Sequence, residues 1–286
     1  VPAAGLSTRF PGMRPKYTLT DYVGHMMIER AIAPYLERHH ITIGVLKEHH
    51  KEYPIDQYLY NKHGRENLEV VVLPERTRGP ADTVRQIFNH ANIPAGSILL
   101  KDCDSFFEHD ELQSNYICTT GIADHEVLKK LSSKSFIQYN ESHITNVVEK
   151  RVVSDRFCVG GYHFANSKDF IMAFDMLELL GEAEIFISHV IKHCIEYNHG
   201  TPWVSNNVRN YIDVGTAEDW HAHNDLSVIF CDIDGTLIKA QPRADFGTPM
   251  TPLEDNVRDD SSDNFVIENQ ANNIVDLTEI NPFGTI

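Results

Sequence analysis

Short apolar runs that alternate with helical patterns constrain the fold of this chain more than any other feature. Three of the runs, TIGVLK (42–47), LEVVVL (68–73) and SILLKD (97–102), predict strands. Segments 22–39 and 81–92 carry apolar residues at helical spacing and predict helices. Continuous apolar strands separated by helices are typical of parallel strands buried on both faces. The pattern therefore predicts an α/β fold whose ligands bind at the carboxyl ends of the strands.

The pattern changes twice farther along the chain. From about 115 to 165, short alternating stretches predict antiparallel strands beside the first half. Segment 172–197 predicts helix with a break near Gly181, and a new apolar strand pattern spans 227–238. We place a boundary near 224–227, which separates a domain of residues 1–224 from a segment of residues 225–286. That segment is rich in Asp and Asn from Asn256 onward, as in a solvated tail or part of an incomplete second domain.

The acidic composition limits the partners. The chain has 25 Lys and Arg residues against 41 Asp and Glu residues, a formal net charge of −16. This charge disfavours nucleic acid or an anionic membrane as a partner, so phosphates must be bound by a few local cations or a metal. The 5 cysteines contain no CxxC pair and indicate neither a disulfide framework nor a zinc site. No run approaches the roughly 18 apolar residues of a membrane span, so we expect a soluble cytoplasmic protein.

The N-terminal stretch VPAAGLSTRF (1–10) is a candidate phosphate-binding turn. Its first residues have the character of the end of a strand, so we expect further natural residues before Val1. A phosphate-binding turn needs glycine or small residues, which let backbone N–H groups approach, and cations that neutralise charge. The stretch offers the small residues Ala3, Ala4, Gly5, Ser7 and Thr8 and the cations Arg9 and Lys16. Taken alone, an ordinary loop with two surface cations explains it equally well.

The order of these residues resembles the signature of the sugar-nucleotidyltransferase superfamily. That signature runs A-G-G-x-G-T-R-x, a spacer and P-K, and this chain has A-A-G-L-S-T-R-F followed by Pro15 and Lys16. The match departs at Ala4 and Ser7, where glycine is usual, and AAG openings resemble cytidylyltransferase-like members. The resemblance covers residues 1–224. It implies a doubly wound, mixed but mainly parallel Rossmann-type sheet of the kind also called GT-A-like.

The resemblance extends to RGPADTV (78–84), which follows the second predicted strand. In the family this segment lies over the base and ribose, which implies Gly79 and Asp82 as nucleotide-binding residues. A plain helix N-terminus with Asp82 in its first turn has the same pattern.

Acidic residues predict a metal site at the edge of the sheet. Asp102 and Asp104 follow an apolar strand, and residues two apart in a strand face the same way, so both carboxylates could approach one cation. Asp104 matches the family's metal-binding aspartate. Asp102 is then expected to support this ligand as one of the nucleotide-binding residues. DVGTAED (213–219) resembles the family's closing motif, which implies Asp213 as the second ligand of one Mg²⁺. Alone, Asp213 fits a turn residue better.

Two further motifs in 147–164 imply an acceptor site. Glu149–Lys150 and the GGY segment with Gly161 and Tyr162 resemble residues that touch the acceptor in sugar-phosphate members. A hairpin with a glycine bulge and a surface ion pair has the same pattern. The implied reaction transfers a nucleotide from an NTP to a phosphorylated sugar or small metabolite and releases pyrophosphate. Arg9 and Mg²⁺ would shield the triphosphate, and Lys16 would bridge the α-phosphate and the incoming phosphate.

A second signature, CDIDGTLIK (231–239), follows the apolar strand VIFC. It resembles the first motif of the haloacid-dehalogenase superfamily, which implies Asp232 as nucleophile and Asp234 as acid/base. Only about 60 residues remain, and the further Ser/Thr, Lys and acidic motifs of a phosphatase are absent in the required order. We therefore expect an incomplete or inactive α/β segment.

These residues favour a cytidylyl-type or related nucleotidyltransferase, with CTP as first choice, UTP or dTTP as alternatives, and surface-polysaccharide precursors as the expected product class. A metal-dependent glycosyltransferase would also use the D-C-D acids, but it has no triphosphate for Arg9 and Lys16 to contact. A bifunctional enzyme with phosphatase activity and a non-catalytic regulatory subunit remain alternatives. The oligomeric state is left open, and a homo-oligomer is compatible with the sequence.

Overall fold

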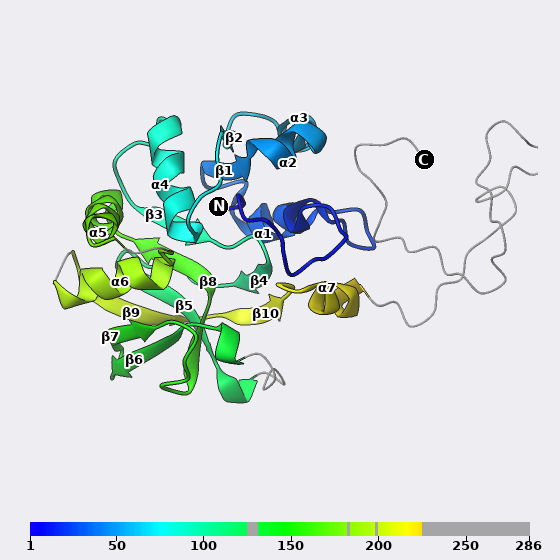
Figure 1. The fold of residues 1–286 in the computed structure, drawn as a ribbon. Coiled ribbons are helices and arrows are strands. Elements are labelled where there is room, and N and C mark those ends of the chain that lie inside the picture. The colour runs from blue at the N-terminus through cyan, green and yellow to red at the C-terminus, as the bar shows by residue number, and fades with distance from the viewer. Residues whose placement is uncertain (125–130, 182–183, 198–199, 225–286) are drawn as a thin grey trace, which may run out of the picture. The chain divides into compact units, whose positions relative to one another are not determined.

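The computed structural model describes residues 1–124, 131–181, 184–197 and 200–224 (Figure 1). The haloacid-dehalogenase-like motif, with Asp232 and Asp234, lies outside these residues. The division of the chain near 224–227 therefore stays a prediction. No helix among the described residues combines the length and the apolar character that crossing a membrane requires.

The first part of the fold is a parallel strand pair. Strand β1 (Ile41–Leu46) pairs with β2 (Leu68–Leu73) in parallel, and the residues just before the N-terminal turn run beside β1. There the Ala3 N–H donates to the Gly44 carbonyl at 2.9 Å, as the strand-end prediction requires. Helices α2 (Lys47–Glu52), α3 (Ile55–His63) and α4 (Pro80–His90) follow these strands. The predicted strands at 42–47 and 68–73 and the helix at 81–92 are confirmed, each within two residues.

The predicted helix at 22–39 is only partly confirmed. Helix α1 is short (Met27–Ile32) and passes into a 3₁₀ turn (Ala33–Tyr35), because Pro34 has no backbone N–H to continue the helix. Residues 22–26 form a turn around the Asp21 carboxylate, which accepts hydrogen bonds from the backbone N–H groups of Val23 and His25. The helical pattern extended into this turn because its apolar residues happen to keep the same spacing.

A six-stranded sheet forms the second part, in the order β3-β8-β5-β9-β7-β6. These strands are β3 (Ile98–Lys101), β5 (Asn115–Gly121), β6 (Phe136–Asn140), β7 (His143–Val148), β8 (Arg156–Phe164) and β9 (Trp203–Asn207). Only β5 and β9 pair in parallel within this sheet, and its other pairings are antiparallel. The antiparallel strands expected between 115 and 165 are thus confirmed.

The expectation of a mainly parallel sheet is wrong for the described residues. Strand β3 pairs antiparallel with β8 and does not extend the parallel β1–β2 pair. Its apolar run could not reveal this, because a strand buried on both faces has the same continuous pattern in either pairing. Strand β5 shows such burial: Ile117 packs in the cluster with the helices, whereas Tyr116 and Cys118 pack in the cluster on the opposite face.

Helices cover one face of this sheet. Helix α5 (Ser167–Leu179) and helix α6 (Ile187–Glu196) pack with α4 against inward-facing strand residues. The fully buried Phe164 of β8, for example, lies in one cluster with Phe170 of α5. Gly181 has a φ of +81° just after α5, which agrees with the predicted break there.

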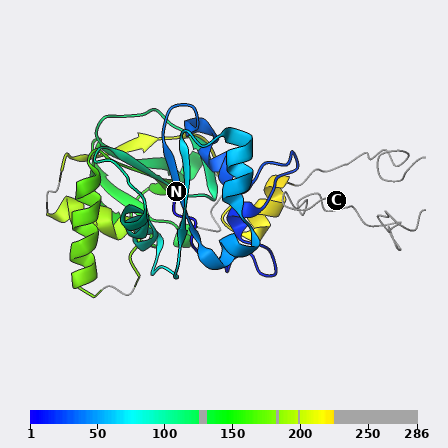
Figure 2. The same ribbon diagram turned by 90° about the horizontal axis from the view of Figure 1, so that it is seen from above.

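A small antiparallel pair closes the described part of the chain. Strand β4 (Ser105–Glu108) pairs with β10 (Arg209–Asp213), and helix α7 (Ala217–Asn224) follows. Both views place α7, in yellow, beside the blue N-terminal segment (Figures 1 and 2). Trp220 of α7 is fully buried in a cluster with Phe10, Leu19 and Met27. The last described helix is thus fastened to the N-terminal turn.

Candidate active site

The N-terminal turn is closed by a serine where the family signature has glycine. Ser7 has a φ of +55°, in the left-handed region that glycine adopts most easily. Its Oγ accepts a hydrogen bond from the Lys16 backbone N–H at 3.0 Å, and its carbonyl accepts one from Phe10 at 2.8 Å. The hydroxyl therefore ties the two ends of the turn together, which offsets part of the backbone strain.

Both predicted cations of the turn reach the same carboxylate. Lys16 Nζ lies 2.5 Å from Asp104 Oδ2, and an Arg9 guanidinium nitrogen lies 3.3 Å from the same oxygen. Arg9 is about half exposed, whereas Lys16 and Asp104 are largely buried. Burial alone would raise the pKa of Asp104, but the charge and hydrogen bond of Lys16, followed by Arg9, hold it well below its usual range. Asp104 is therefore ionised at neutral pH.

The two predicted metal ligands meet although they lie more than a hundred residues apart. In the β4–β10 pair, Asp213 is the register partner of Ser105, and the Val214 N–H donates to the Asp104 carbonyl at 3.0 Å. A Cβ on Gly215 would lie 3.1 Å from Asp213 Oδ1 and 3.2 Å from Asp104 Oδ2. One carboxylate oxygen of each aspartate, and Arg9 Nη1 at 3.3 Å, thus lie around the position that a Cβ on Gly215 would take.

The rest of the closing motif holds this arrangement in place. Thr216 precedes α7 and exchanges hydrogen bonds with Asp219: its hydroxyl donates to the carboxylate at 2.6 Å and accepts from the backbone N–H at 3.2 Å. This reciprocal pair stabilises the start of the helix. The Ala217 N–H donates to the Arg9 carbonyl at 3.3 Å, so the helix start is joined to the N-terminal turn.

Asp102 lines the cavity and is partly buried. Burial, followed by the nearby charge of Asp104, raises the pKa of Asp102 to about 6. A Cβ on Gly160, whose φ is +87°, would come within 2.6 Å of Asp102 Oδ2. Glycine at 160 therefore makes room for this carboxylate, which the DCD pattern places beside Asp104.

Lys101 supports the loop that carries both acids. Its buried Nζ donates to the Asp102 carbonyl at 2.7 Å, to the Ser105 carbonyl at 2.5 Å and to the Ser105 hydroxyl at 3.0 Å. Burial lowers the pKa of Lys101 to about 8, although the charges of Asp102 and Asp104 oppose this shift. Sequence reasoning did not single out this lysine, because a lysine at the end of a strand usually projects into water.

Lys134 is a second cation that sequence reasoning missed. It lies just before β6, and its Nζ is 2.5 Å from Asp213 Oδ2 and 3.2 Å from the Tyr211 hydroxyl. Burial would lower the pKa of Lys134, but Tyr211 and Asp213 raise it above its ordinary value, so the ammonium is charged. Nothing in the stretch SSKSF distinguishes Lys134 from a surface lysine, and only the fold brings it to Asp213.

The predicted base segment begins α4 in a conformation that requires glycine. Gly79 has a φ of +153°, and a Cβ there would lie 2.8 Å from the Ile185 carbonyl oxygen. Asp82 does not line the cavity: its carboxylate accepts from the Arg78 backbone N–H at 2.9 Å and from Arg78 Nε at 3.1 Å. Thr83 lines the cavity instead and shares a 2.7 Å hydrogen bond with the Thr77 hydroxyl. Asp82 therefore holds the conformation of this segment through Arg78, outside the cavity.

The predicted acceptor residues lie on the sheet side of the cavity. Glu149 accepts hydrogen bonds from the Ser135 hydroxyl and, at 2.6 Å, from the Ser188 hydroxyl. Lys150 Nζ lies 4.3 Å from the centre of the Phe186 ring. These groups form a rim of hydroxyls, one carboxylate and one ammonium, which suits a ligand that carries both hydroxyl and phosphate groups.

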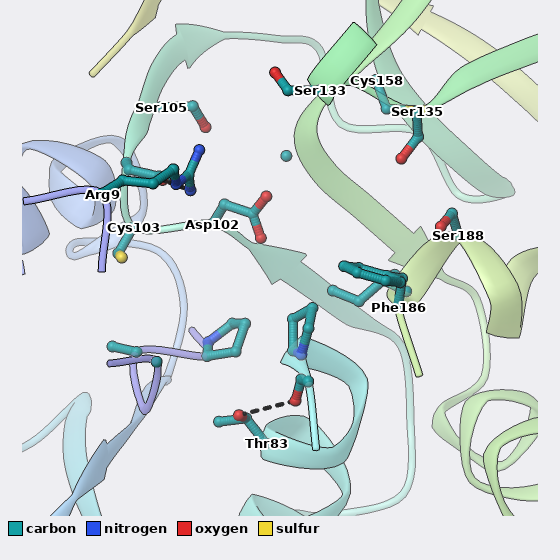
Figure 3. Close-up of a pocket in the computed structure, with 18 of the residues that line it drawn as sticks. Arg9, Thr83, Asp102, Cys103, Ser105, Ser133, Ser135, Cys158, Phe186 and Ser188 are labelled. Carbon is teal, nitrogen blue, oxygen red and sulfur yellow. Dashed lines mark hydrogen bonds and ion pairs between the residues drawn. The ribbon is translucent and has the colours of Figure 1, made fainter. Parts of the chain in front are cut away.

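One cavity of about 780 Å³ contains most of the predicted residues. Its lining includes Ala3, Gly5, Ser7, Thr8, Arg9, Lys16, Gly79, Asp102, Asp104, Glu149, Lys150, Tyr162 and Asp213. Figure 3 shows Asp102 between Arg9 on one side and Ser135 and Ser188 on the other, with Thr83 at the α4 end. The cavity therefore joins the N-terminal turn to the six-stranded sheet.

Three predicted residues lie outside this lining. Ala4 packs in the apolar cluster under β1 and β2, and Asp82 holds Arg78 as described above. A Cβ on Gly161 would point at Phe107 and Cys118 in the core, so Gly160 faces the cavity in its place. Within the described ranges, no group of three or more His, Cys, Asp or Glu side chains is placed to hold a metal ion.

Comparison with known proteins places the fold. No family model and no curated protein matches the chain. A nucleoside-diphosphate-sugar pyrophosphorylase from Vibrio cholerae RC9 superposes with a TM-score of 0.65 at 19% identity, covering 77% of this chain and 97% of that one. The inositol-1-phosphate CTP transferase of T. maritima gives 0.59 at 16% identity, with 76% and 88% covered. The CTP:phosphocholine cytidylyltransferase of Streptococcus pneumoniae gives 0.59 at 15% identity, with 78% and 95% covered.

These similarities show the fold and not the activity, because all the identities are low. The described residues have the α/β fold, with mixed sheets, that is found in nucleotide-sugar pyrophosphorylases and cytidylyltransferases. This supports the fold that the N-terminal motifs implied.

Proposed function

We propose that the chain is a nucleotidyltransferase that transfers a nucleoside monophosphate from an NTP to a phosphorylated sugar or small metabolite. The observation that carries the proposal is the meeting of Arg9 and Lys16 with Asp104, beside Asp213, in one cavity. A strongly acidic protein can bind a triphosphate where cations gather locally in this way. The similar solved structures are named for reactions of this class, which adds support.

In the proposed reaction, an oxygen of the acceptor's phosphate forms a bond to the α-phosphorus of the NTP. The bond from that phosphorus to the bridging oxygen breaks, and pyrophosphate leaves with the electron pair. No protein nucleophile is needed, so the work of the protein is alignment and charge neutralisation. Lys16 would bind between the α-phosphate and the incoming phosphate, while Arg9 would neutralise the triphosphate.

Asp104 and Asp213 fit a Mg²⁺ ion. Their oxygens converge on the space beside Gly215, and both carboxylates are held by ammonium groups that already mark the place as one for positive charge. Mg²⁺ prefers few protein oxygens and keeps other positions for water and phosphate, so two carboxylates suffice. When bound, the ion would neutralise the phosphate charge that develops during transfer.

CTP is our first choice of nucleotide, with UTP and dTTP as alternatives, because the AAG opening resembles cytidylyl members. Glu149, Lys150 and Tyr162 would contact the acceptor, and the product would be a precursor of a surface polysaccharide. For residues 225–286 we retain the proposal of an incomplete haloacid-dehalogenase-like segment with Asp232 and Asp234.

The test is a pyrophosphate-release assay with Mg²⁺, each NTP and a panel of sugar and polyol phosphates. We expect release with one pyrimidine nucleotide and a narrow set of acceptors. Asp104→Asn should lower turnover by about 10³-fold, since it removes a metal ligand and leaves two cations without their charged partner. Asp110→Asn is the matched control, because Asp110 follows β4, the strand that Asp104 precedes, but it is exposed and its carboxylate pairs with Arg209. A flat trace across the whole panel would reject the proposal.

A further inference from the structure

Lys134 is placed unlike a structural lysine, because it lies in the cavity and holds one of the two convergent carboxylates. Its side chain is 18% exposed, and its Nζ contacts Asp213 Oδ2 at 2.5 Å. Two of its three N–H donors have partners among the described residues, Asp213 and Tyr211. The ammonium can therefore also bind a further anion.

The arrangement around the two aspartates is nearly symmetric. Lys16 contacts Asp104 at 2.5 Å from the N-terminal turn, and Lys134 contacts Asp213 at the same distance from the start of β6. Both lysine side chains are 18% exposed. Lys16 and Lys134 thus approach the same pair of carboxylates from two different parts of the fold, and each neutralises one of them.

The surroundings of the two lysines differ in a way that assigns them different ligands. Lys16 follows the turn that forms the nucleotide end of the cavity. Lys134 is followed directly by Ser135, whose hydroxyl donates to Glu149, and Ser188 donates to the same carboxylate. Figure 3 shows Ser133 and Ser135, the neighbours of Lys134 in the chain, across the cavity from Arg9. Lys134 therefore belongs to the acceptor end.

Charge balance would let both lysines change partners during the proposed reaction. If a divalent cation is bound between Asp104 and Asp213, the aspartates no longer need the ammonium groups for neutralisation. The substrates then bring several negative charges on phosphate oxygens into the same space. A lysine is a flexible point charge and can move from a carboxylate to a phosphate oxygen a short distance away.

We propose that Lys134 is a further catalytic residue, which pairs with Asp213 in the substrate-free protein and binds the acceptor's phosphate when a divalent cation takes its place. This role rests on the proposed nucleotidyl transfer. Lys134 would neutralise the phosphate that attacks the α-phosphorus and hold it in line, as Lys16 does from the nucleotide end. A purely structural Lys134 would instead fasten β10 to the start of β6 in every state.

The chain contains a closely matched control. Lys62 pairs with the buried carboxylate of Glu29 at 2.9 Å and donates to the Tyr58 hydroxyl at 3.2 Å, as Lys134 does with Asp213 and Tyr211. Lys62 lies outside the cavity lining. Lys62→Met therefore removes the same kind of ion pair without touching the proposed site.

The first measurement is Mn²⁺ binding to the substrate-free protein, followed by electron paramagnetic resonance. Lys134→Met should bind Mn²⁺ about three- to tenfold more tightly than the parent, because the competing ammonium is gone, and Lys62→Met should match the parent. Unchanged or weaker Mn²⁺ binding by Lys134→Met would overturn the exchange at Asp213. This result does not depend on turnover.

The second measurement uses inorganic phosphate as a probe of the acceptor's phosphate subsite. Calorimetry is done on protein loaded with Mn²⁺ and the α,β-methylene analogue of the NTP that supports turnover. Lys134→Met should weaken phosphate binding at least about tenfold and raise the acceptor KM similarly, with the NTP KM within about twofold. Equal losses for acceptor and NTP, or a loss shared by Lys62→Met, would reject the assignment.

A further pair of variants covers the case in which Lys134→Met does not fold. Lys134→Arg keeps a cation and should retain phosphate binding within about threefold, whereas Lys134→Gln keeps an N–H donor without the charge and should lose it. Equal behaviour of the two would also reject the assignment. Failure of the wild-type protein to release pyrophosphate with any NTP would instead reject the proposed function itself, and the Mn²⁺ measurement would still decide the exchange at Asp213.

Discussion

The two ends of the cavity, the proposed nucleotide end and the proposed acceptor end, are built in different ways. The nucleotide end comes from one short stretch, in which Ser7, Arg9 and Lys16 are linked by a single turn. The acceptor end is assembled from separate elements: Ser135 from the start of β6, Glu149 after β7 and Ser188 from α6. A contiguous site can be recognised as a motif, whereas a dispersed site becomes visible only in the fold.

The difference has an energetic side. In the turn, one side chain can satisfy its own backbone, as Ser7 does for Lys16, so local sequence fixes local geometry. At the acceptor end, the position of each group depends on the packing of the sheet and α6. We therefore expect few substitutions to be tolerated at the nucleotide end. At the acceptor end, we expect a single side-chain substitution to be able to change which ligand binds.

Removal of the Lys16 charge should have the largest effect. Lys16→Met is expected to lower turnover by about 10³-fold, because the α-phosphate loses its cation and Asp104 loses its closest partner. The loss should appear in pyrophosphate release at saturating acceptor, and Lys62→Met is the control. A loss confined to the acceptor KM would show that Lys16 belongs to the acceptor end and would break the comparison.

Asp102, which lines the cavity between the two ends, should make the free energy of unfolding depend on pH. The pKa of Asp102 is raised from an ordinary value near 3.8 to about 6 by burial and by Asp104, so the native state holds this proton more tightly than the unfolded state does. The stabilisation is complete below about pH 3.8 and is lost as the pH rises through 6. Asp102→Asn mimics the protonated form and should gain stability relative to the parent as the pH rises.

Urea unfolding at pH 5 and pH 7 measures the difference in stability between Asp102→Asn and the parent protein. We expect the advantage of Asp102→Asn to widen by about 1 kcal/mol between these values and to level off above them. A gap that is constant with pH would mean that Asp102 titrates normally. Such a result would contradict the close packing of Asp102 against Gly160.

A substitution at the acceptor end should change the acceptor KM, whereas one at the nucleotide end should change turnover. Glu149→Gln still accepts hydrogen bonds from Ser135 and Ser188 through its amide oxygen, but it loses the charge that strengthens bonds to ligand hydroxyls. We expect the acceptor KM to rise about tenfold and the NTP KM to stay within about twofold. Glu111→Gln, at an exposed ion pair with His39 and Arg38, is the control. An equal rise in both KM values would contradict separate ends.

The sequence predicted the features that are encoded locally and missed those that depend on distant elements. The α/β class, the parallel β1–β2 pair and the antiparallel strands between 115 and 165 were predictable, because hydrophobic patterns encode burial. The pairing of β3 with β8 was not, since burial on both faces looks alike in parallel and antiparallel sheets. The fold brings Asp104 and Asp213 near each other, and their role as metal ligands stays a prediction.

Lys101 and Lys134 mark the limit of the sequence. Lys101 ends β3 and Lys134 lies just before β6, positions where a lysine is usually solvated. Each is buried because the fold brings carboxylate or carbonyl oxygens to its ammonium group. Gly161 illustrates the same limit at finer scale. The GGY motif could not tell which glycine faces the cavity, and the alternation of β8 turns Gly160 toward it.

The smallest predicted effect tests why the turn tolerates serine at position 7. Ser7→Ala loses the hydrogen bond to the Lys16 N–H and keeps a Cβ in the left-handed region, so unfolding should become about 1 kcal/mol easier. Ser7→Gly loses the same bond but relieves the backbone strain, so its stability should stay within about 0.5 kcal/mol of the parent. Urea unfolding of the three proteins at one pH separates the two terms. Equal stability of the alanine and glycine variants would mean that the φ of +55° costs nothing, and the hydroxyl alone would then account for the serine.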